Sequence, residues 1–118
     1  MEYKTDKPIY LQIVDYVCNK IVQNHWQDNE RIPSVRELSV LLSVNPNTVA
    51  RSFEHIEQQS IIYNKRGIGY FVAVGARQKI LEIYKKEFFE ELLPEVFARM
   101  QLYNISIEEI NHAYRRQP

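Results

Sequence analysis

Short polar side chains and cations that could contact a polyanion are concentrated between residues 34 and 67. An asparagine side chain at the exposed start of a helix can form two hydrogen bonds with the edge of adenine, and threonine can contact other bases. Arginine and lysine can neutralise phosphate charges. The candidate nucleic-acid contacts are Ser34, Arg36, Asn45, Asn47, Thr48, Arg51, Lys65, Arg66 and Gly67. Their chemistry is therefore non-covalent recognition of bases and phosphates.

Two short helices are predicted to position these residues. Ser34 and Glu37 have the spacing of a capping box, which predicts a helix that begins directly after Ser34. Asn45 followed by Pro46 predicts the start of a second helix, because a proline at the first helical position has no intrahelical hydrogen bond to lose. Two capped helices around a tight turn are typical of a helix-turn-helix, whose second helix enters the major groove. The alternative is an ordinary pair of helices with solvated polar side chains.

A β-hairpin is predicted directly after these helices. The β-prone runs at 61–63 and 70–72 flank a segment that contains Gly67 and Gly69. Glycine permits positive φ angles and a close approach of the backbone to a ligand. Lys65 and Arg66 would place two cations at the tip, where they could reach phosphate or the minor groove. The alternative is a solvated turn with incidental charges. The whole pattern predicts a winged helix-turn-helix that binds duplex DNA.

Three segments of the chain resemble the DNA-binding domain of the GntR family of bacterial transcription regulators. They are IPSVREL at 32–38, VNPNTV at 44–49 and GIGYFV at 67–72. The opening PIYLQI at 8–13 and the NPNTV turn are similar to the YtrA-type branch of that family. The resemblance covers residues 8–74.

The resemblance implies specific DNA contacts and a function. The positions that match family contacts are Arg36, Thr48, Gly67 and, at the tip of the hairpin, Arg66. The chain departs from the family where Pro46 and Ala50 replace arginines that many members carry, and Arg51 stands one position later. The family's usual base contacts are therefore not carried over to Arg51. The resemblance further implies a transcription regulator, most often a repressor, that controls a neighbouring transporter operon.

The remainder of the chain, from 77 to 118, is predicted to be helical and to form a dimer. Pro94 should kink or divide the first helix, and Ser106 with Glu109 forms a second capping box that starts another. The candidate dimer contacts are Leu81, Tyr84, Phe88, Leu92, Val96, Phe97 and Met100. This segment has more apolar surface than it can bury by itself, so pairing with a second copy is expected, as the resemblance also implies. The alternative is a tail that folds back on its own domain.

Composition limits the class of protein. The 118 residues carry no net charge, with 15 basic and 15 acidic side chains, but 31–66 holds five bases and three acids, which implies modest DNA affinity per subunit. The single cysteine, Cys18, is expected to be structural and suits a reducing cytoplasm. We find no catalytic set, phosphate loop or metal-ligand cluster, and no signal peptide or membrane-length apolar run. We therefore expect no enzyme activity, no cofactor and no metal.

These inferences combine into one prediction of fold, organisation and function. The fold is mostly α with a small β-hairpin, divided into a winged helix-turn-helix at 1–76 and a helical dimerisation segment at 77–118. The protein is predicted to be a cytoplasmic homodimer that binds an inverted-repeat operator and has no membrane partner. Two alternatives stay open: a winged-helix adaptor that binds protein without specific DNA binding, and a sensor with an effector pocket at the dimer seam. The sequence gives no indication of which small molecule would act as the effector.

Overall fold

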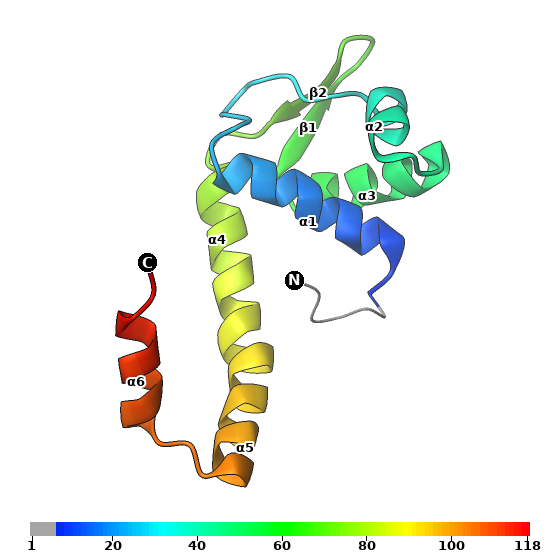
Figure 1. The fold of residues 1–118 in the computed structure, drawn as a ribbon. Helices are drawn as coiled ribbons and strands as arrows, with labels where there is room; N and C mark the ends of the chain where they lie inside the picture. The colour runs from blue at the N-terminus through cyan, green and yellow to red at the C-terminus, as the bar shows by residue number, and fades with distance from the viewer. Residues whose placement is uncertain (1–6) are drawn as a thin grey trace. The chain divides into compact units, whose positions relative to one another are not determined.

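The computed structural model describes residues 7–118, which form two compact units. The first unit ends at Leu81, and the second comprises Glu82–Pro118. The elements shown in Figure 1 are, in chain order, α1 (Ile9–Val22), α2 (Val35–Leu42), α3 (Pro46–Gln58), β1 (Ile62–Lys65), β2 (Gly69–Val72), α4 (Ala76–Glu87), η1 (Phe88–Leu92), α5 (Leu93–Tyr103) and α6 (Ile107–Arg115). A mostly helical chain with one antiparallel hairpin confirms the predicted fold class.

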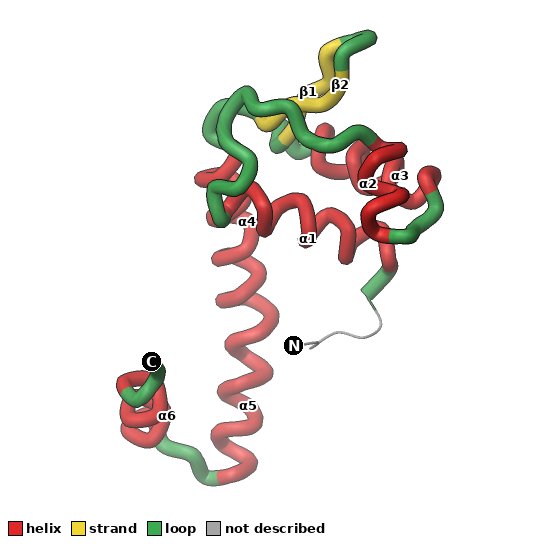
Figure 2. The backbone as a smooth tube through the Cα atoms, turned by 45° about the horizontal axis from the view of Figure 1, so that its top comes forward, coloured by secondary structure: helices red, strands yellow, loops and turns green. Residues whose placement is uncertain are grey.

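The core of the first unit lies between α1, α3 and the hairpin. Most of its buried apolar side chains come from the helices: Ile13, Val14, Val17, Cys18 and Ile21 of α1, Leu38 of α2, Val49, Phe53 and Ile56 of α3, and Ala76 and Ile80 of α4. The hairpin and the segments beside it contribute Ile32, Ile61, Ile62 and Val72. The members from α1 recur every three or four residues, which places them on one face of that helix. The buried thiol of Cys18 agrees with the structural role predicted for it. The core thus holds α3 between α1 and the hairpin (Figure 2).

A tight turn joins α2 to α3, as the two predicted caps require. Ser43 adopts the left-handed conformation with φ 56°, and the amide of Val44 donates to the carbonyl of Ser39 at 3.0 Å. Leu38 is fully buried, whereas Leu41, which has helical spacing relative to it, is 63% exposed. An eight-residue helix that packs on α3 covers only a narrow stripe, and Leu41 lies beyond it. The predicted pair of capped helices is confirmed.

The hairpin has its predicted tip, and a short upstream segment of the chain pairs with one of its strands. β1 and β2 are antiparallel, with Ile62 opposite Val72 and Lys65 opposite Gly69. Gly67 has φ 78°, a conformation that favours glycine and closes the turn. Upstream chain pairs with β2 through an isolated bridge between Arg31 and Phe71. In Figures 1 and 2 the tip of the hairpin projects away from the helices of this unit.

The second unit continues α4 through one turn of π-helix, η1, into α5. The amide of Leu93 donates to the carbonyl of Phe88, five residues earlier, directly before Pro94. Proline has no amide hydrogen, and its ring crowds the carbonyl four residues back, so regular α-helical bonding cannot continue there. A kink or a division of the helix was predicted at Pro94, and the structure has a π turn directly before it, through which the helix continues. The capping box predicted at Ser106 and Glu109 is also present, and it starts α6.

Candidate nucleic-acid interface

The exposed start of α3 presents the residues predicted to contact bases. The side-chain oxygen of Asn45 accepts the amide hydrogen of Asn47 at 2.8 Å, so Asn45 is the N-cap of this helix. Pro46 follows at the first helical position. The side chains of Asn45 and Asn47 are exposed, and Thr48 is half-buried. Asn47 therefore offers a carboxamide to solvent on a rigid helical turn, while one acceptor of Asn45 is committed to the cap.

The start of α2 combines a capping box with an exposed arginine. The hydroxyl of Ser34 accepts from the amide of Glu37 at 3.0 Å, and the amide of Ser34 donates to the Glu37 carboxylate at 2.9 Å. Hydrogen bonds from the backbone and hydroxyl of Ser34, and more weakly the charge of Arg31, hold the pKa of Glu37 below its ordinary value of 4.5. Arg36 is exposed beside this cap. The structure thus gives Ser34 a structural role and leaves Arg36 accessible.

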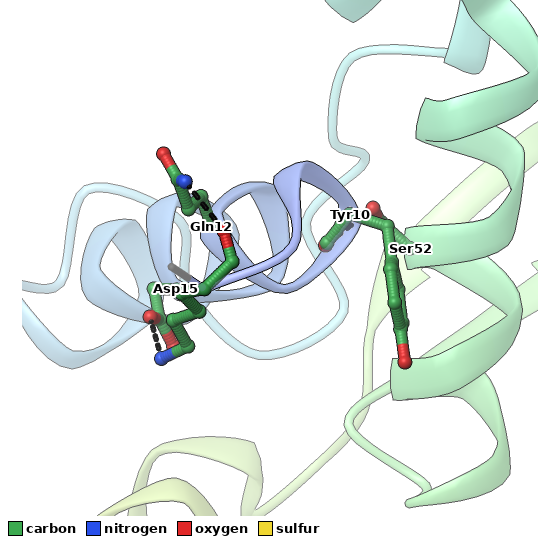
Figure 3. A network of polar contacts seen from close by, with 5 residues as sticks. Tyr10, Gln12, Asp15 and Ser52 are labelled. Atoms are coloured by element: carbon green, nitrogen blue, oxygen red, sulfur yellow. Dashed lines mark hydrogen bonds and ion pairs between the residues drawn. The ribbon is translucent and has the colours of Figure 1, made fainter. Parts of the chain in front are cut away.

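Arg51 lies further along α3, where its side chain packs on α1. The guanidinium carbon is 3.7 Å from the centroid of the Tyr10 ring, a cation–π contact. A hydrogen bond connects the same two helices: the hydroxyl of Ser52 donates to the carbonyl of Tyr10 at 2.7 Å, and it also lies 3.0 Å from the carbonyl of Thr48. Figure 3 shows Ser52 and Tyr10 side by side. Sequence reasoning placed Arg51 on the recognition helix but gave no sign that Tyr10 would hold its guanidinium.

The hairpin carries cations at its tip, as predicted, and one of them packs on aromatic rings of the strands. The Lys65 ammonium lies 4.6 Å from the centroid of the Phe71 ring, and that ring stacks on Tyr63 with centroids 5.7 Å apart. Arg66 and Gly67 are exposed at the tip. Lys65 is therefore held against the strands, whereas Arg66 projects from the turn without a partner among the described residues.

Tyr70, on the opposite face of β2, joins the hairpin to α3. Its ring meets Phe53 edge-on, with centroids 5.0 Å apart. Burial raises the pKa of Tyr70, and the nearby carboxylates of Glu57 and Glu54 add to the shift. This contact links the base of the hairpin to α3, so both candidate contact elements belong to the same packed part of the first unit.

Arg31 is a cation near the hairpin that sequence reasoning counted in the charge balance but did not place. A Cβ at Gly69 would lie 2.9 Å from the Nε atom of Arg31, so the guanidinium packs directly on the glycine backbone. The only signal for this contact in the sequence is a glycine near the end of the hairpin, which is common for other reasons.

The candidate dimer contacts are all in or near the second unit. Leu81 closes the first unit and is half-buried. The other members are half-buried or exposed within the second unit: Tyr84, Phe88, Leu92, Val96, Phe97 and Met100. Phe88 and Phe97 are 45% and 47% exposed, values that leave about half of each ring to contact solvent or a partner.

Within residues 7–118 the structure contains no group of three or more histidine, cysteine, aspartate or glutamate side chains arranged to hold a metal ion. In the same range no helix is both long enough and apolar enough to cross a membrane.

Comparison with known proteins assigns this fold to a family. Residues 9–72 match the model of the bacterial regulatory proteins of the gntR family, which is more than half of the chain. The chain belongs to the GntR family. The segment matched includes both helices of the helix-turn-helix and the hairpin, so the resemblance predicted from the sequence is confirmed.

Curated relatives share nearly the whole length of this GntR chain. The helix-turn-helix transcriptional regulator YhcF of Bacillus subtilis is 32% identical over 92% of this chain and 88% of that protein. The transcriptional repressor YtrA of the same organism is 26% identical over 92% of this chain and 82% of that protein. Both names describe transcriptional regulators, and the chain is a GntR-family transcriptional regulator with a DNA-binding domain, not an enzyme.

Solved structures show the same architecture. A GntR-family transcriptional regulator from Bacteroides thetaiotaomicron is 44% identical, with a TM-score of 0.77 over 92% of this chain and 94% of that chain. The DNA-binding domain of AraR, solved in complex with operator ORR3, is 25% identical, with a TM-score of 0.57 over 62% of this chain and 88% of that chain.

Proposed function

We propose that this GntR-family regulator is a repressor that binds an inverted-repeat operator in duplex DNA as a homodimer. The observation that carries the proposal is the exposed start of α3, where Asn47 and Thr48 follow a capped turn in the helix-turn-helix. In this class of domain the first residues of the second helix contact base edges in the major groove. The complex of AraR with its operator supports a DNA-binding role for the same architecture here.

The candidate contacts have different proposed roles. Asn47 and Thr48 contact bases, because they present a carboxamide and a hydroxyl at the start of α3. Arg36 and Arg66 are exposed cations that contact phosphate or base edges. The remaining members position these groups or contact phosphate themselves. Ser34 and Asn45 cap the helices, and Gly67 closes the turn. Arg51 and Lys65 are cations held in place by the rings of Tyr10 and Phe71.

The segment 77–118 is proposed to be the dimerisation part and 1–76 the DNA-binding part. No side chain of the second unit is buried, although the unit contains Phe88, Phe89, Phe97 and Met100, and its apolar stripe needs a cover. A second copy of the same stripe provides one by two-fold symmetry. Linking two weakly binding DNA-binding domains makes the second contact with DNA intramolecular, which raises the affinity by about 10²-fold to 10⁴-fold.

Three finer points rest on relatives and on family resemblance. The name of the relative YtrA supports repression. The resemblance to the YtrA-type branch supports a neighbouring transporter operon as the target. We place the protein in the cytoplasm, where a DNA-binding regulator meets its operator and where the single thiol of Cys18 would stay reduced.

The test is selection of duplexes from a random pool with the full-length protein, followed by titration of the selected site over a series of salt concentrations. We expect an inverted repeat and a linear fall of log affinity with log salt concentration. Asn47→Ala should weaken binding by about 1 to 3 kcal/mol and relax the preference at one base-pair position. Gln58→Ala, at the other end of α3, is the matched control and should bind as the unsubstituted protein does.

Each result has a definite meaning. Equal weakening of Asn47→Ala on every sequence would show that Asn47 positions the DNA backbone and does not read bases. A selected site without a repeat would contradict the dimeric operator. Failure to bind any duplex in a salt-dependent way would favour the protein-binding adaptor over the regulator proposed here.

A further inference from the structure

The outer face of the hairpin, which points away from the core, brings together two aromatic rings, one glycine and two cations. Strand residues alternate between faces, so Tyr63 and Lys65 of β1 share a face with Phe71 and Gly69, their partners on β2. The bridge between Arg31 and Phe71 places Arg31 on the same face, because directly opposed residues point the same way. These five residues, Arg31, Tyr63, Lys65, Gly69 and Phe71, are called the outer face below.

The guanidinium of Arg31 is held on this face by the absence of a side chain at Gly69. A Cβ there would meet the Nε atom at 2.9 Å, the nearer terminal nitrogen at 3.4 Å and the central carbon at 3.6 Å. Because the central carbon is farther away than both nitrogens, the edge of the guanidinium that carries Nε and one terminal nitrogen faces Gly69. Arg31 is exposed, and the guanidinium also has donors on its terminal nitrogens that do not face Gly69.

Lys65 stands beside the same glycine. It is the register partner of Gly69, and its ammonium lies over the ring of Phe71, 4.6 Å from the centroid. Phe71 is in turn fixed by stacking on Tyr63, whose hydroxyl donates to the side-chain oxygen of Asn29 at 2.9 Å. Packing therefore holds both cations close to Gly69, one on the glycine itself and the other on the neighbouring ring.

Neither cation has an acidic partner in the part of the chain that the structure describes, 7–118. The carboxylate of Glu37 feels the charge of Arg31, but it is already hydrogen-bonded to the amide of Ser34. Arg31 and Lys65 lie on one face of the hairpin, and an anion that both contact would offset the repulsion between their charges. The forked donors of arginine match a phosphate, and the lysine ammonium adds a point charge.

We propose that Arg31 and Lys65 together bind one phosphate of the DNA backbone on the outer face of the hairpin. This site rests on the proposed function and adds to it a contact that flanks the base-reading helix. It carries no sequence information, because phosphate contacts set the position of the protein and the total affinity. Gly69 belongs to the site, since any side chain there would displace the guanidinium of Arg31.

The experiment measures, for full-length variants, the slope of log affinity against log salt concentration on the selected duplex and on an unrelated duplex of equal length. Arg31→Ala should reduce the slope by about 0.9 on both duplexes, the value for one phosphate contact on B-form DNA. Arg31→Lys should retain most of the slope, because it keeps the charge. Lys20→Ala removes a cation from α1 and is the matched control, with an unchanged slope expected.

A second set of variants tests whether the two cations contact the same phosphate and whether the site requires the absence of a side chain at Gly69. If they share it, the losses of affinity in Arg31→Ala and Lys65→Ala do not add in the double variant. Gly69→Ala should reproduce the slope of Arg31→Ala and cause no further loss when combined with it. Gly75→Ala also places alanine at a positive φ, 79°, but has no neighbour within 4 Å, so it controls for backbone strain alone.

The outcomes separate this site from the proposed function. If the unsubstituted protein binds DNA with a salt-dependent affinity while Arg31→Ala keeps the full slope, the phosphate site is wrong and the proposed function stands. Additive losses in the double variant would overturn the shared phosphate. If Arg31→Ala lowers the melting temperature without changing the slope, Arg31 only supports the hairpin. Failure of the unsubstituted protein to bind duplex DNA would overturn both proposals.

Discussion

The two units of the protein are built from the same local signals but differ in what they bury. Each contains a capping box of the same type, Ser34 with Glu37 in the first and Ser106 with Glu109 in the second. Yet every buried side chain among the described residues lies in the first unit. Capping and helix propensity are therefore enough to specify helices, whereas a closed core requires elements that are distant in sequence to pack together. The second unit has the helices without the core.

The largest expected effect distinguishes two phenylalanines by their burial. Phe53 is fully buried and packs against Tyr70, whereas Phe97 is 47% exposed in the second unit. Phe53→Ala should lower the free energy of unfolding by about 3 to 5 kcal/mol, since it leaves a cavity. Phe97→Ala should change it by about 0.5 kcal/mol or less at dilutions where the chain is monomeric. Urea unfolding of both variants measures the difference. Similar losses in the free energy of unfolding would contradict the conclusion that only the first unit has a closed core.

The next largest effect is expected on dimerisation through the apolar residues of the second unit. Leu92→Asp would place an unpaired charge in the proposed dimer seam, so we expect the dimer dissociation constant to rise roughly 100-fold, or about 2.7 kcal/mol. Melting of the first unit should not change. Gln101→Asp introduces the same charge at an exposed polar position on α5 and is the matched control. Analytical ultracentrifugation decides the question, and a monomeric unsubstituted chain would end the dimer proposal.

A smaller effect compares the two capping boxes directly. Ser34→Ala and Ser106→Ala each remove the hydroxyl that accepts from the third helical amide, which costs about 1 kcal/mol. In the first unit the loss should appear in global unfolding, because α2 is part of the core. In the second unit it should appear as faster amide hydrogen exchange within α6. Glu109→Gln preserves the capping motif and should leave that exchange nearly unchanged.

The smallest effect is a dependence on pH in the first unit. Hydrogen bonds from Ser34 hold the pKa of Glu37 below 4.5, so the native state favours the ionised carboxylate. Its contribution to stability is therefore present above pH 4.5 and is lost as the pH falls through the lowered pKa. The urea midpoint should fall in acid less steeply for Glu37→Gln than for the unsubstituted chain. Identical pH profiles for the two proteins would show that this carboxylate contributes nothing measurable.

The sequence predicted the features that depend on neighbouring residues. Ser34, Asn45 and Ser106 were expected to cap helices, and each accepts the expected amide hydrogen bond. A glycine-containing tip was expected for the hairpin and is present. These features follow from backbone groups that only nearby side chains can satisfy, so a short window of sequence contains all the information needed.

Contacts between distant residues were not predictable in the same way. Arg51 meets Tyr10 across α3 and α1, and Arg31 meets Gly69 across the hairpin edge. Both arginines looked equivalent to other surface cations in the sequence, because nothing near them specifies their partners. The exposure of Leu41 has a related cause, since helical spacing predicts a face but not how much of that face a neighbouring helix covers.

The π turn before Pro94 determines how the apolar residues of the long helix align. They recur at every fourth position, namely Tyr84, Phe88, Leu92, Val96 and Met100. In a regular α-helix a step of four residues overshoots one turn by about 40°, so this row would drift by about 160° around the axis. The wider turn accommodates one extra residue and reduces the drift to about 60°. The turn thus gathers the row toward a single face.

This alignment gives the segment Phe88–Leu92 an unusual tolerance to changes in chain length. Losing one residue there would remove the extra residue of the wider turn and leave the apolar row in phase, and the helix would still have to bend around Pro94. Losing one residue elsewhere in α4 or α5 would rotate everything beyond it by about 100° and divide the row. In related chains, insertions and deletions within this helix should therefore concentrate in these five positions.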